Sequence, residues 1–203
     1  MNKDYPQDLQ EAIEFHGHFC PGLAIGYRAA KAALEKLAAA RAGDEELVAI
    51  VETDACGVDA VQSLLGCTMG KGNLIYKDYG KQVYTVASRK QGKAVRVALK
   101  PDAFPQPPGA DALRAAVFGG TASAEQRKEF QQLQQARIGR LLAANTDELF
   151  KVEWVDMPLP QPARIFGSVV CGFCGEAVME PRARLQDGKI ACLSCHEEYT
   201  RGW

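Results

Sequence analysis

The sequence has no excess of charge of either sign and no long hydrophobic run. Lysine plus arginine total 24 and aspartate plus glutamate total 25, so the formal net charge is −1. Such a chain has no global attraction to nucleic acid or to an anionic membrane surface. The longest aliphatic runs, such as LVAIV at 47–51, are far too short to span a bilayer. The opening MNKDYPQD has no apolar core of a signal peptide, so we expect a cytoplasmic protein without membrane association.

Histidine is scarce, with three residues in 203, and the seven cysteines are an odd number that is partly arranged as Cys-x-x-Cys pairs. This usage favours metal or redox chemistry over a framework of disulfides. Two of the histidines and one cysteine fall in FHGHFCPG at 15–22, and four more cysteines fall within 171–195. These two stretches are the candidate functional regions.

A proline-rich stretch, PLPQP at 158–162, divides the chain. Its proline density suits neither a helix nor an inner strand, which is typical of a linker. We therefore expect a core domain over residues 1–160 and a small C-terminal domain over residues 161–203.

Hydrophobic patterning in the core alternates between helical and extended segments. Apolar residues at helical spacing predict a helix that begins at Pro21, and further helices are expected at 57–65 and from Ser123 to about Asn145. ELVAIVET at 46–53 predicts a buried strand, and NLIYK, QVYTVAS and KAVRVALK predict three strands in a meander. The predicted fold class is α+β, with a mixed or antiparallel sheet and helices, followed by the small domain.

The C-terminal region holds two Cys-x-x-Cys pairs, Cys171 with Cys174 and Cys192 with Cys195, separated by seventeen residues. This spacing is typical of a four-cysteine zinc site, because two such turns can aim four thiolates at the corners of a tetrahedron. About forty residues bury too little apolar surface to fold alone, so Zn²⁺ would supply the folding free energy. The alternatives are two disulfides, a redox dithiol, or a cubane iron–sulfur cluster.

The charge of this small domain bears on its partner. Residues 163–203 carry five basic and five acidic side chains, and a zinc ion with four thiolates adds about −2. The domain therefore lacks the basic surface that dominates affinity for nucleic acid. We expect it to have a structural role or to contact a protein partner.

The N-terminal motif predicts a second site. If Pro21 is the first residue of a helix, Cys20 occupies the N-cap, where free amides and the helix dipole stabilise a thiolate. Cys56 repeats the device after the strand at 46–53. In an extended segment His16 and His18 would point to the same side. We expect His18, Cys20 and Cys56 to hold a divalent metal, with His16 as the fourth ligand or a hydrogen-bonding partner of a ligand.

Each of these residues also has an ordinary structural interpretation. A single cysteine is most often a small buried hydrophobic residue, and a histidine is often a hydrogen-bonded core group. Glu52 and Asp54 could act in acid–base chemistry, and Asp59 could orient a ligand. Cys67 would lie about 16 Å from Cys56 along a continuous helix, so it is either a packing residue or a contributor to a site in a second protomer.

Three blocks, FHGHFCPGLAIGYRAA, DACGVDAVQSLLGCTMGKGNL and DYGK, resemble the FmdE family, which is named for a component of formylmethanofuran dehydrogenase. The resemblance is strong over about residues 8–100, and the paired cysteines match the members of the family that carry a zinc finger. It implies an α+β core, an intertwined homodimer, and an association with the molybdenum- or tungsten-dependent enzyme that forms formylmethanofuran. The family's His-Cys motif maps onto His16, His18 and Cys20, and its second cysteine maps onto Cys56.

Two classes of function follow. In the first, the protein is a metal-binding accessory or regulatory protein whose zinc finger contacts a partner. In the second, it is a metalloenzyme that uses the His/Cys site of the core for redox or hydrolytic chemistry. An open coordination position beside a substrate-sized pocket would favour the enzyme.

Overall fold

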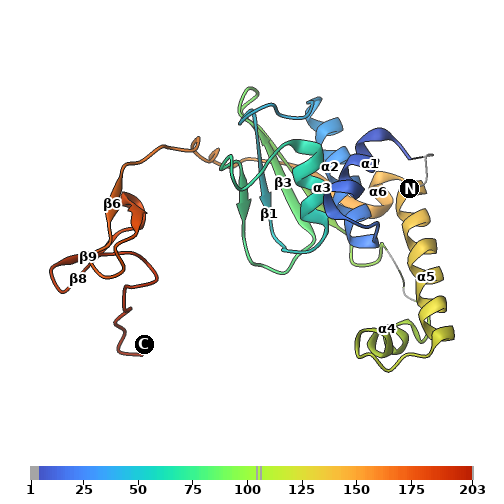
Figure 1. Cartoon of the computed structure of the whole chain (residues 1–203). Coiled ribbons are helices and arrows are strands. Elements are labelled where there is room, and N and C mark those ends of the chain that lie inside the picture. The colour runs from blue at the N-terminus through green and yellow to red at the C-terminus, as the bar shows by residue number, and fades with distance from the viewer. Residues whose placement is uncertain (1–4, 104, 106, 203) are drawn as a thin grey trace. The chain divides into compact units, whose positions relative to one another are not determined.

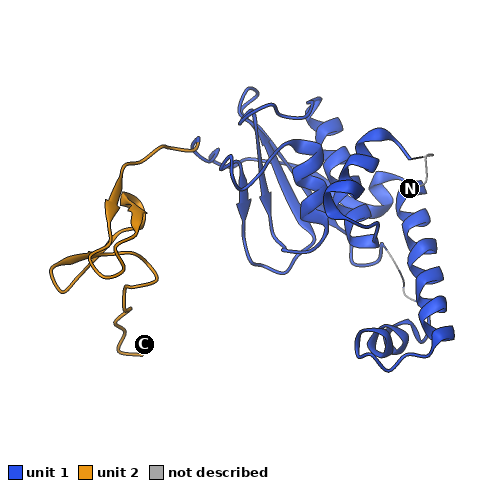
Figure 2. Cartoon of the chain, viewed as in Figure 1, with its two compact units in different colours: residues 1–162 blue, residues 163–203 orange. Residues whose placement is uncertain are grey.

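The computed structural model describes residues 5–103, 105 and 107–202 (Figure 1). The chain forms two compact units, Met1–Pro162 and Ala163–Trp203 (Figure 2). The larger unit is an α+β fold and the smaller one is built from short hairpins, so the predicted fold class is confirmed. No described helix has both the length and the apolar character needed to cross a membrane.

A mixed five-stranded sheet forms the centre of the larger unit. Its strands are β1 (Leu47–Val51), β2 (Leu74–Tyr76), β3 (Val83–Ser88), β4 (Lys93–Leu99) and β5 (Phe150–Val155). Their order is β2-β1-β3-β4-β5, in which β2 runs parallel to β1 and the remaining neighbours are antiparallel. Strand β1 is buried along its whole length, as the run LVAIV suggested.

The predicted meander is wrong in one respect, because β2 does not pair with β3. Strand β1 lies between them, and β2 joins the outer side of β1 through helix α3 (Gly57–Leu65). A parallel pair needs a crossover connection of this kind, whereas consecutive antiparallel strands need only a turn. Strand β5, which was not predicted, pairs with β4 at the other edge.

The other helices are α1 (Gln7–His16), α2 (Pro21–Leu37), α4 (Ala110–Phe118), α5 (Ala124–Ala143) and α6 (Thr146–Leu149). The expected start of α2 at Pro21 is confirmed, and so is the capping box that Ser123 and Gln126 form at the start of α5. Helices α1 and α4 were not predicted. Helix α2 packs against α3, β3 and β4, and its fully buried leucines and alanines form much of the core.

Helices α2 and α3 approach each other unusually closely. A Cβ added to Gly26 of α2 would lie 2.0 Å from the carbonyl oxygen of Gly57, the first residue of α3. Only a residue without a side chain permits this contact. The contact brings the beginnings of the two helices together, which places Cys20 near Cys56.

Helix α5 extends away from the sheet and carries α4 at its far end (Figure 1). Ile138 and Leu141 are its two buried residues among those described. The Arg28 guanidinium of α2 donates hydrogen bonds to the carbonyl oxygens of Leu141, Leu142 and Ala144 at the C-terminal end of α5. Arginine thereby satisfies carbonyl groups that the end of a helix leaves free.

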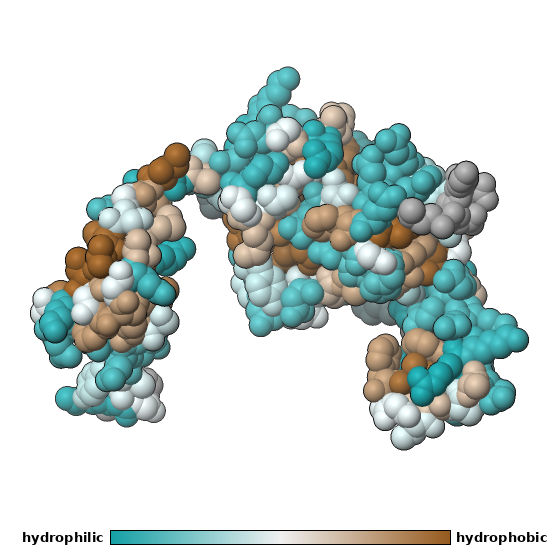
Figure 3. All heavy atoms as spheres, viewed as in Figure 1, coloured by the Kyte–Doolittle hydropathy of each residue, from teal (hydrophilic) through white to brown (hydrophobic). Residues whose placement is uncertain are grey.

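The smaller unit contains two hairpins, β6 (Ser168–Val170) with β7 (Ala177–Met179) and β8 (Arg184–Gln186) with β9 (Lys189–Ala191), and a short 3-10 helix, η1 (Glu180–Arg182). Hydrophobic side chains are visible on its surface (Figure 3). The residues that it buries are Cys171, Ala191 and Cys192 among those described. So small an apolar core cannot hold the unit together without a further cross-link.

Candidate metal centres

The larger unit brings one histidine and two cysteines together where three helices meet. His16 is the last residue of α1, while Cys20 and Cys56 directly precede α2 and α3. One donor atom from each lies within 4.8 Å of the other two. Two metal–sulfur bonds of about 2.3 Å at a tetrahedral angle separate their sulfurs by about 3.8 Å, so small torsional adjustments would let all three bind one ion.

Local backbone geometry explains why His16 and Cys20 meet. Gly17 adopts φ 89°, the left-handed conformation that commonly ends a helix and that glycine adopts without strain. This conformation ends α1 at His16, and the chain reverses within three residues to begin α2. The imidazole Nε2 therefore lies 3.9 Å from the Cys20 Sγ.

The orientation of His16 is fixed by Asp59 of α3. The His16 Nδ1 lies 2.6 Å from the Asp59 Oδ2, and Gln62 Nε2 donates to the Asp59 Oδ1 at 3.3 Å. A hydrogen bond from Nδ1–H to the carboxylate leaves Nε2 free to bind a metal, which is the common arrangement around metal-ligating histidines. Asp59 thus occupies the orienting position that its place in the sequence suggested.

His16, rather than His18, completes the group with the two cysteines. The expectation placed both histidines in an extended segment, with His18 nearer to the thiols. Instead α1 continues through His16, and His18 lies in the turn after Gly17 with an exposed side chain. The two imidazole rings remain close, with centroids 4.5 Å apart. Among the described residues His18 belongs to no group of potential metal ligands.

The two thiols are in different environments. Cys20 is the N-cap of α2 as expected, and its sulfur accepts a hydrogen bond from the amide of Leu23 at 3.4 Å. Cys56 has a right-handed helical conformation and its side chain makes no capping bond, so the expected repeat of this device is not formed. Burial and the neighbouring Cys20 raise the pKa of the Cys56 thiol. A bound cation would displace its proton.

A pocket of about 380 Å³ adjoins the site. His16, Cys56 and Asp59 line it, together with Val51, Thr53, Asp54, Ala55, Val58, Gln62, Met69, Leu74 and Tyr76. Gln62, Met69 and Tyr76 were not predicted as site residues. Tyr76 ends β2, and the parallel pairing of β2 with β1 carries it to the same edge of the sheet as the residues after β1. That signal depends on the strand order, which the sequence pattern does not reveal.

Two other candidates lie outside the site. The carboxylate of Glu52 pairs with Arg96 across the sheet at 3.5 Å. Cys67 is fully buried, and burial raises its pKa to about 12. Because α3 ends at Leu65, the assumed continuous helix from Cys56 to Cys67 does not exist. Within this chain Cys67 is a packing residue, the first of the two interpretations given above.

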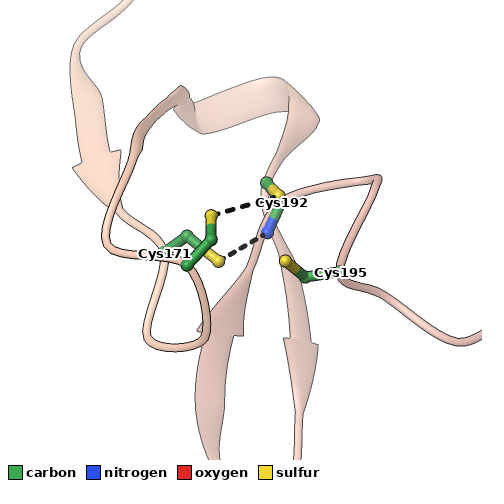
Figure 4. Close-up of side chains that lie close together, drawn as sticks. Cys171, Cys192 and Cys195 are labelled. Atoms are coloured by element: carbon green, nitrogen blue, oxygen red, sulfur yellow. Dashed lines mark hydrogen bonds between the residues drawn. The ribbon is translucent and has the colours of Figure 1, made fainter.

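The smaller unit brings its four cysteines together. One sulfur from each of Cys171, Cys174, Cys192 and Cys195 lies within 4.8 Å of the others, and three of the residues appear in Figure 4. The sulfurs of Cys174 and Cys192 are 3.9 Å apart, close to the edge of about 3.8 Å expected for a tetrahedron around zinc. The amide of Cys192 donates to the Cys171 sulfur at 3.3 Å (Figure 4).

Hydrogen bonds divide these four thiols into unlike groups. Amides of Cys174, Cys192 and Phe173 lower the pKa of Cys171 to about 6. The neighbouring sulfurs, beginning with Cys192, raise the pKa of Cys195 to about 12. Four thiolates so close together repel one another, and a divalent cation would remove this repulsion. The donor set therefore fits Zn²⁺.

Comparison with known families assigns both units. The model described as "FmdE, Molybdenum formylmethanofuran dehydrogenase operon" matches residues 15–151. The chain belongs to the FmdE family. A second model, the prokaryotic dksA/traR C4-type zinc finger, matches residues 164–201. This FmdE protein therefore carries a C-terminal zinc finger, and the cysteine cluster agrees with zinc binding there.

Two individual proteins are similar to this FmdE chain. A protein of Archaeoglobus fulgidus named "Probable S-adenosyl-L-methionine-binding protein" is 36% identical over 199 residues, which cover 94% of this chain and 53% of that protein. The chain thus spans about half the length of this relative. A solved structure of an FmdE-like protein of tungsten formylmethanofuran dehydrogenase, from Syntrophus aciditrophicus, is 24% identical, with a TM-score of 0.59. The likeness covers 92% of this chain and 89% of that chain, and it shows the fold.

Proposed function

We propose that this FmdE protein is a metal-binding accessory or regulatory protein with a second metal centre in its core, held by His16 Nε2 and the sulfurs of Cys20 and Cys56. The observation that carries the proposal is the convergence of these three donors, within 4.8 Å of one another, from the ends of three helices. Packing of the helices positions the donors, so binding would require little reorganisation of the fold.

The donor set determines the kind of metal. Two thiolates and one neutral imidazole suit a soft or borderline divalent ion such as Zn²⁺, and they leave the centre electrically neutral. Three protein ligands leave one position of a tetrahedron open to an exogenous ligand, whereas the finger's four thiolates close its shell. The core centre is therefore suited to an exchanging ligand and the finger to a structural role.

The partner-binding role is proposed for the zinc finger. Its large apolar side chains are exposed, including Ile165, Leu185 and Tyr199, and its basic and acidic residues balance. A protein surface is a better match for this composition than nucleic acid. Reduced cysteines in both units suit a cytoplasmic location, which we also propose.

The pocket beside the core site favours a second candidate function, a metalloenzyme. A cavity of about 380 Å³ next to His16 and Cys56 has the size of a small-molecule site. Redox and hydrolytic chemistry are both open to such a centre. The name of the Archaeoglobus relative makes S-adenosyl-L-methionine the first molecule to test as a ligand, by equilibrium dialysis against the metal-loaded protein.

Metal analysis of the purified chain tests the proposed centre. We expect two equivalents of metal per chain in the wild type and one in Cys20→Ala, Cys56→Ala or Cys171→Ala. Cys67→Ala is the matched control, because Cys67 is buried outside both clusters, and it should retain two equivalents. One equivalent in the wild type, unchanged in Cys20→Ala, would refute a core metal centre.

We also propose that the chain is a homodimer, in which the arm formed by α4 and α5 packs on a second copy. Helix α5 buries little of its own surface, and the side chain of Phe118 at the end of α4 is 77% exposed. Apolar groups on a projecting arm are typical of exchange between protomers. Sedimentation at micromolar concentration should give twice the chain mass of 22.0 kDa, and a monomer would contradict the proposal.

A further inference from the structure

We infer that the pocket beside the core site selects small donor molecules that carry a positive charge and rejects anionic ones. This inference rests on the metal centre proposed above. His16 and Cys56 both line the pocket, whereas Cys20 does not. The sulfur of Cys20 is instead held at the start of α2 by the amide of Leu23. A ligand that takes the open coordination position therefore reaches the metal from the pocket.

Charge around the pocket gives the class of ligand. The carboxylates of Asp54 and Asp59 line it, and no lysine or arginine is among its lining residues in the described part of the chain. Asp59 is bonded to His16, but Asp54 is exposed and has no ion pair with any described residue. Since the metal centre itself is neutral, the pocket carries net negative charge. A cationic ligand gains from this field and an anionic ligand is repelled.

The remaining walls restrict the size and polarity of the ligand. Val51, Val58 and Leu74 provide an aliphatic surface, and the hydroxyl groups of Thr53 and Tyr76 provide hydrogen bonds. The volume is near the lower end of the range for small-molecule pockets. The expected ligand is a small organic molecule with a nitrogen or sulfur donor at one end and an ammonium or other cationic group within reach of Asp54.

Three thiols that differ only in their end group test the inference on the full-length protein loaded with Co²⁺. Cysteamine, 2-mercaptoethanol and 3-mercaptopropionate share the same donor and spacer, but they end in a cation, a neutral group and an anion. Binding is followed by the visible absorption of Co²⁺, to which the closed finger should contribute no change. We expect cysteamine to bind about tenfold more tightly than 3-mercaptopropionate, with 2-mercaptoethanol between them.

Aspartate variants connect the selectivity to the pocket. Asp54→Asn should reduce the tenfold ratio to about threefold or less, because one of two carboxylates remains. Asp54→Glu should preserve the ratio. Asp44→Asn is the matched control, since Asp44 is an exposed aspartate that precedes β1 while Asp54 follows it. It should leave the ratio unchanged.

The outcomes separate failure of this inference from failure of the metal centre. If the Co²⁺ spectrum of the wild type equals that of Cys20→Ala, the core binds no metal and both proposals are wrong. If the core binds Co²⁺ but the three thiols bind equally, or the anion binds most tightly, only the charge selectivity is overturned. The same holds if Asp54→Asn leaves the ratio at its wild-type value.

Discussion

Replacing Gly26 by alanine should destabilise the larger unit and weaken its metal site together. A Cβ at this position would lie 2.0 Å from the carbonyl oxygen of Gly57, and real contacts of a Cβ essentially never fall below 3.0 Å. Helices α2 and α3 must therefore separate by at least about 1 Å, since 3.0 − 2.0 = 1.0. The obstacle is backbone, so no side-chain rotation can relieve it.

The expected magnitude follows from two opposing effects. Overpacking a close contact typically costs about 1–3 kcal/mol. Alanine is the better helix former by about 1 kcal/mol, which offsets part of this loss. Because backbone must move, we expect the cost to exceed the gain, with a net destabilisation of about 2 kcal/mol. Cys20 and Cys56 lie at the starts of the separating helices, so the affinity of the core for metal should fall on the order of tenfold.

Gly139 of α5 provides the matched control. It is also a glycine inside a helix, but a Cβ added there meets no atom within 4 Å among the described residues. Gly139→Ala should therefore stabilise the protein by up to about 1 kcal/mol. Amide hydrogen exchange in β1 and β3 would report the stability of the larger unit alone. Equal stabilisation by both substitutions would refute the argument from close helix contact.

Three further predictions concern other contacts. Asp59→Asn should lower the affinity of the core for metal by about 10–100-fold and leave the finger unchanged, as measured by competition with a chelator. Arg28→Ala should destabilise the attachment of α5 by about 2–3 kcal/mol, seen as faster amide exchange in α5 than in β1, and equal exchange in both would contradict this. Burial raises the pKa of Cys67 to about 12, so the stability that its neutral form provides is present below pH 9 and is lost as the pH rises toward 12. In Cys67→Ala the unfolding free energy should depend less steeply on pH in that range, and an unchanged slope would contradict the prediction.

Features that depend on neighbouring residues were predictable from the sequence. The start of α2 at Pro21 follows from the fixed torsion of proline, and the N-cap position of Cys20 follows directly from it. The convergence of the four finger cysteines follows from the reach of two short turns. In each case the information lies within a few residues of the feature that it determines.

Features set by the end of one element or by distant contacts were not predictable. Whether His16 or His18 faces the thiols depends on where α1 ends, and α1 itself was missed because QDLQEAIEFH carries a weak apolar pattern. The place of β2 beside β1 depends on the crossover through α3, and short strands alone do not reveal their neighbours. Tyr76 joins the pocket only as a consequence of that strand order.

The two metal clusters differ in what holds their donors in place, and this difference suits them to different roles. In the core, the donors come from the ends of three helices that pack on a buried sheet, and contacts such as Gly26 with Gly57 position the ligands before any ion arrives. In the finger, the four thiols make up much of the buried surface, so the ion is itself the core of the fold. A site built by packing can leave one coordination position unfilled without loss of structure. A fold that depends on its ion needs every ligand, so exchange chemistry belongs to the core centre and stable contact to the finger.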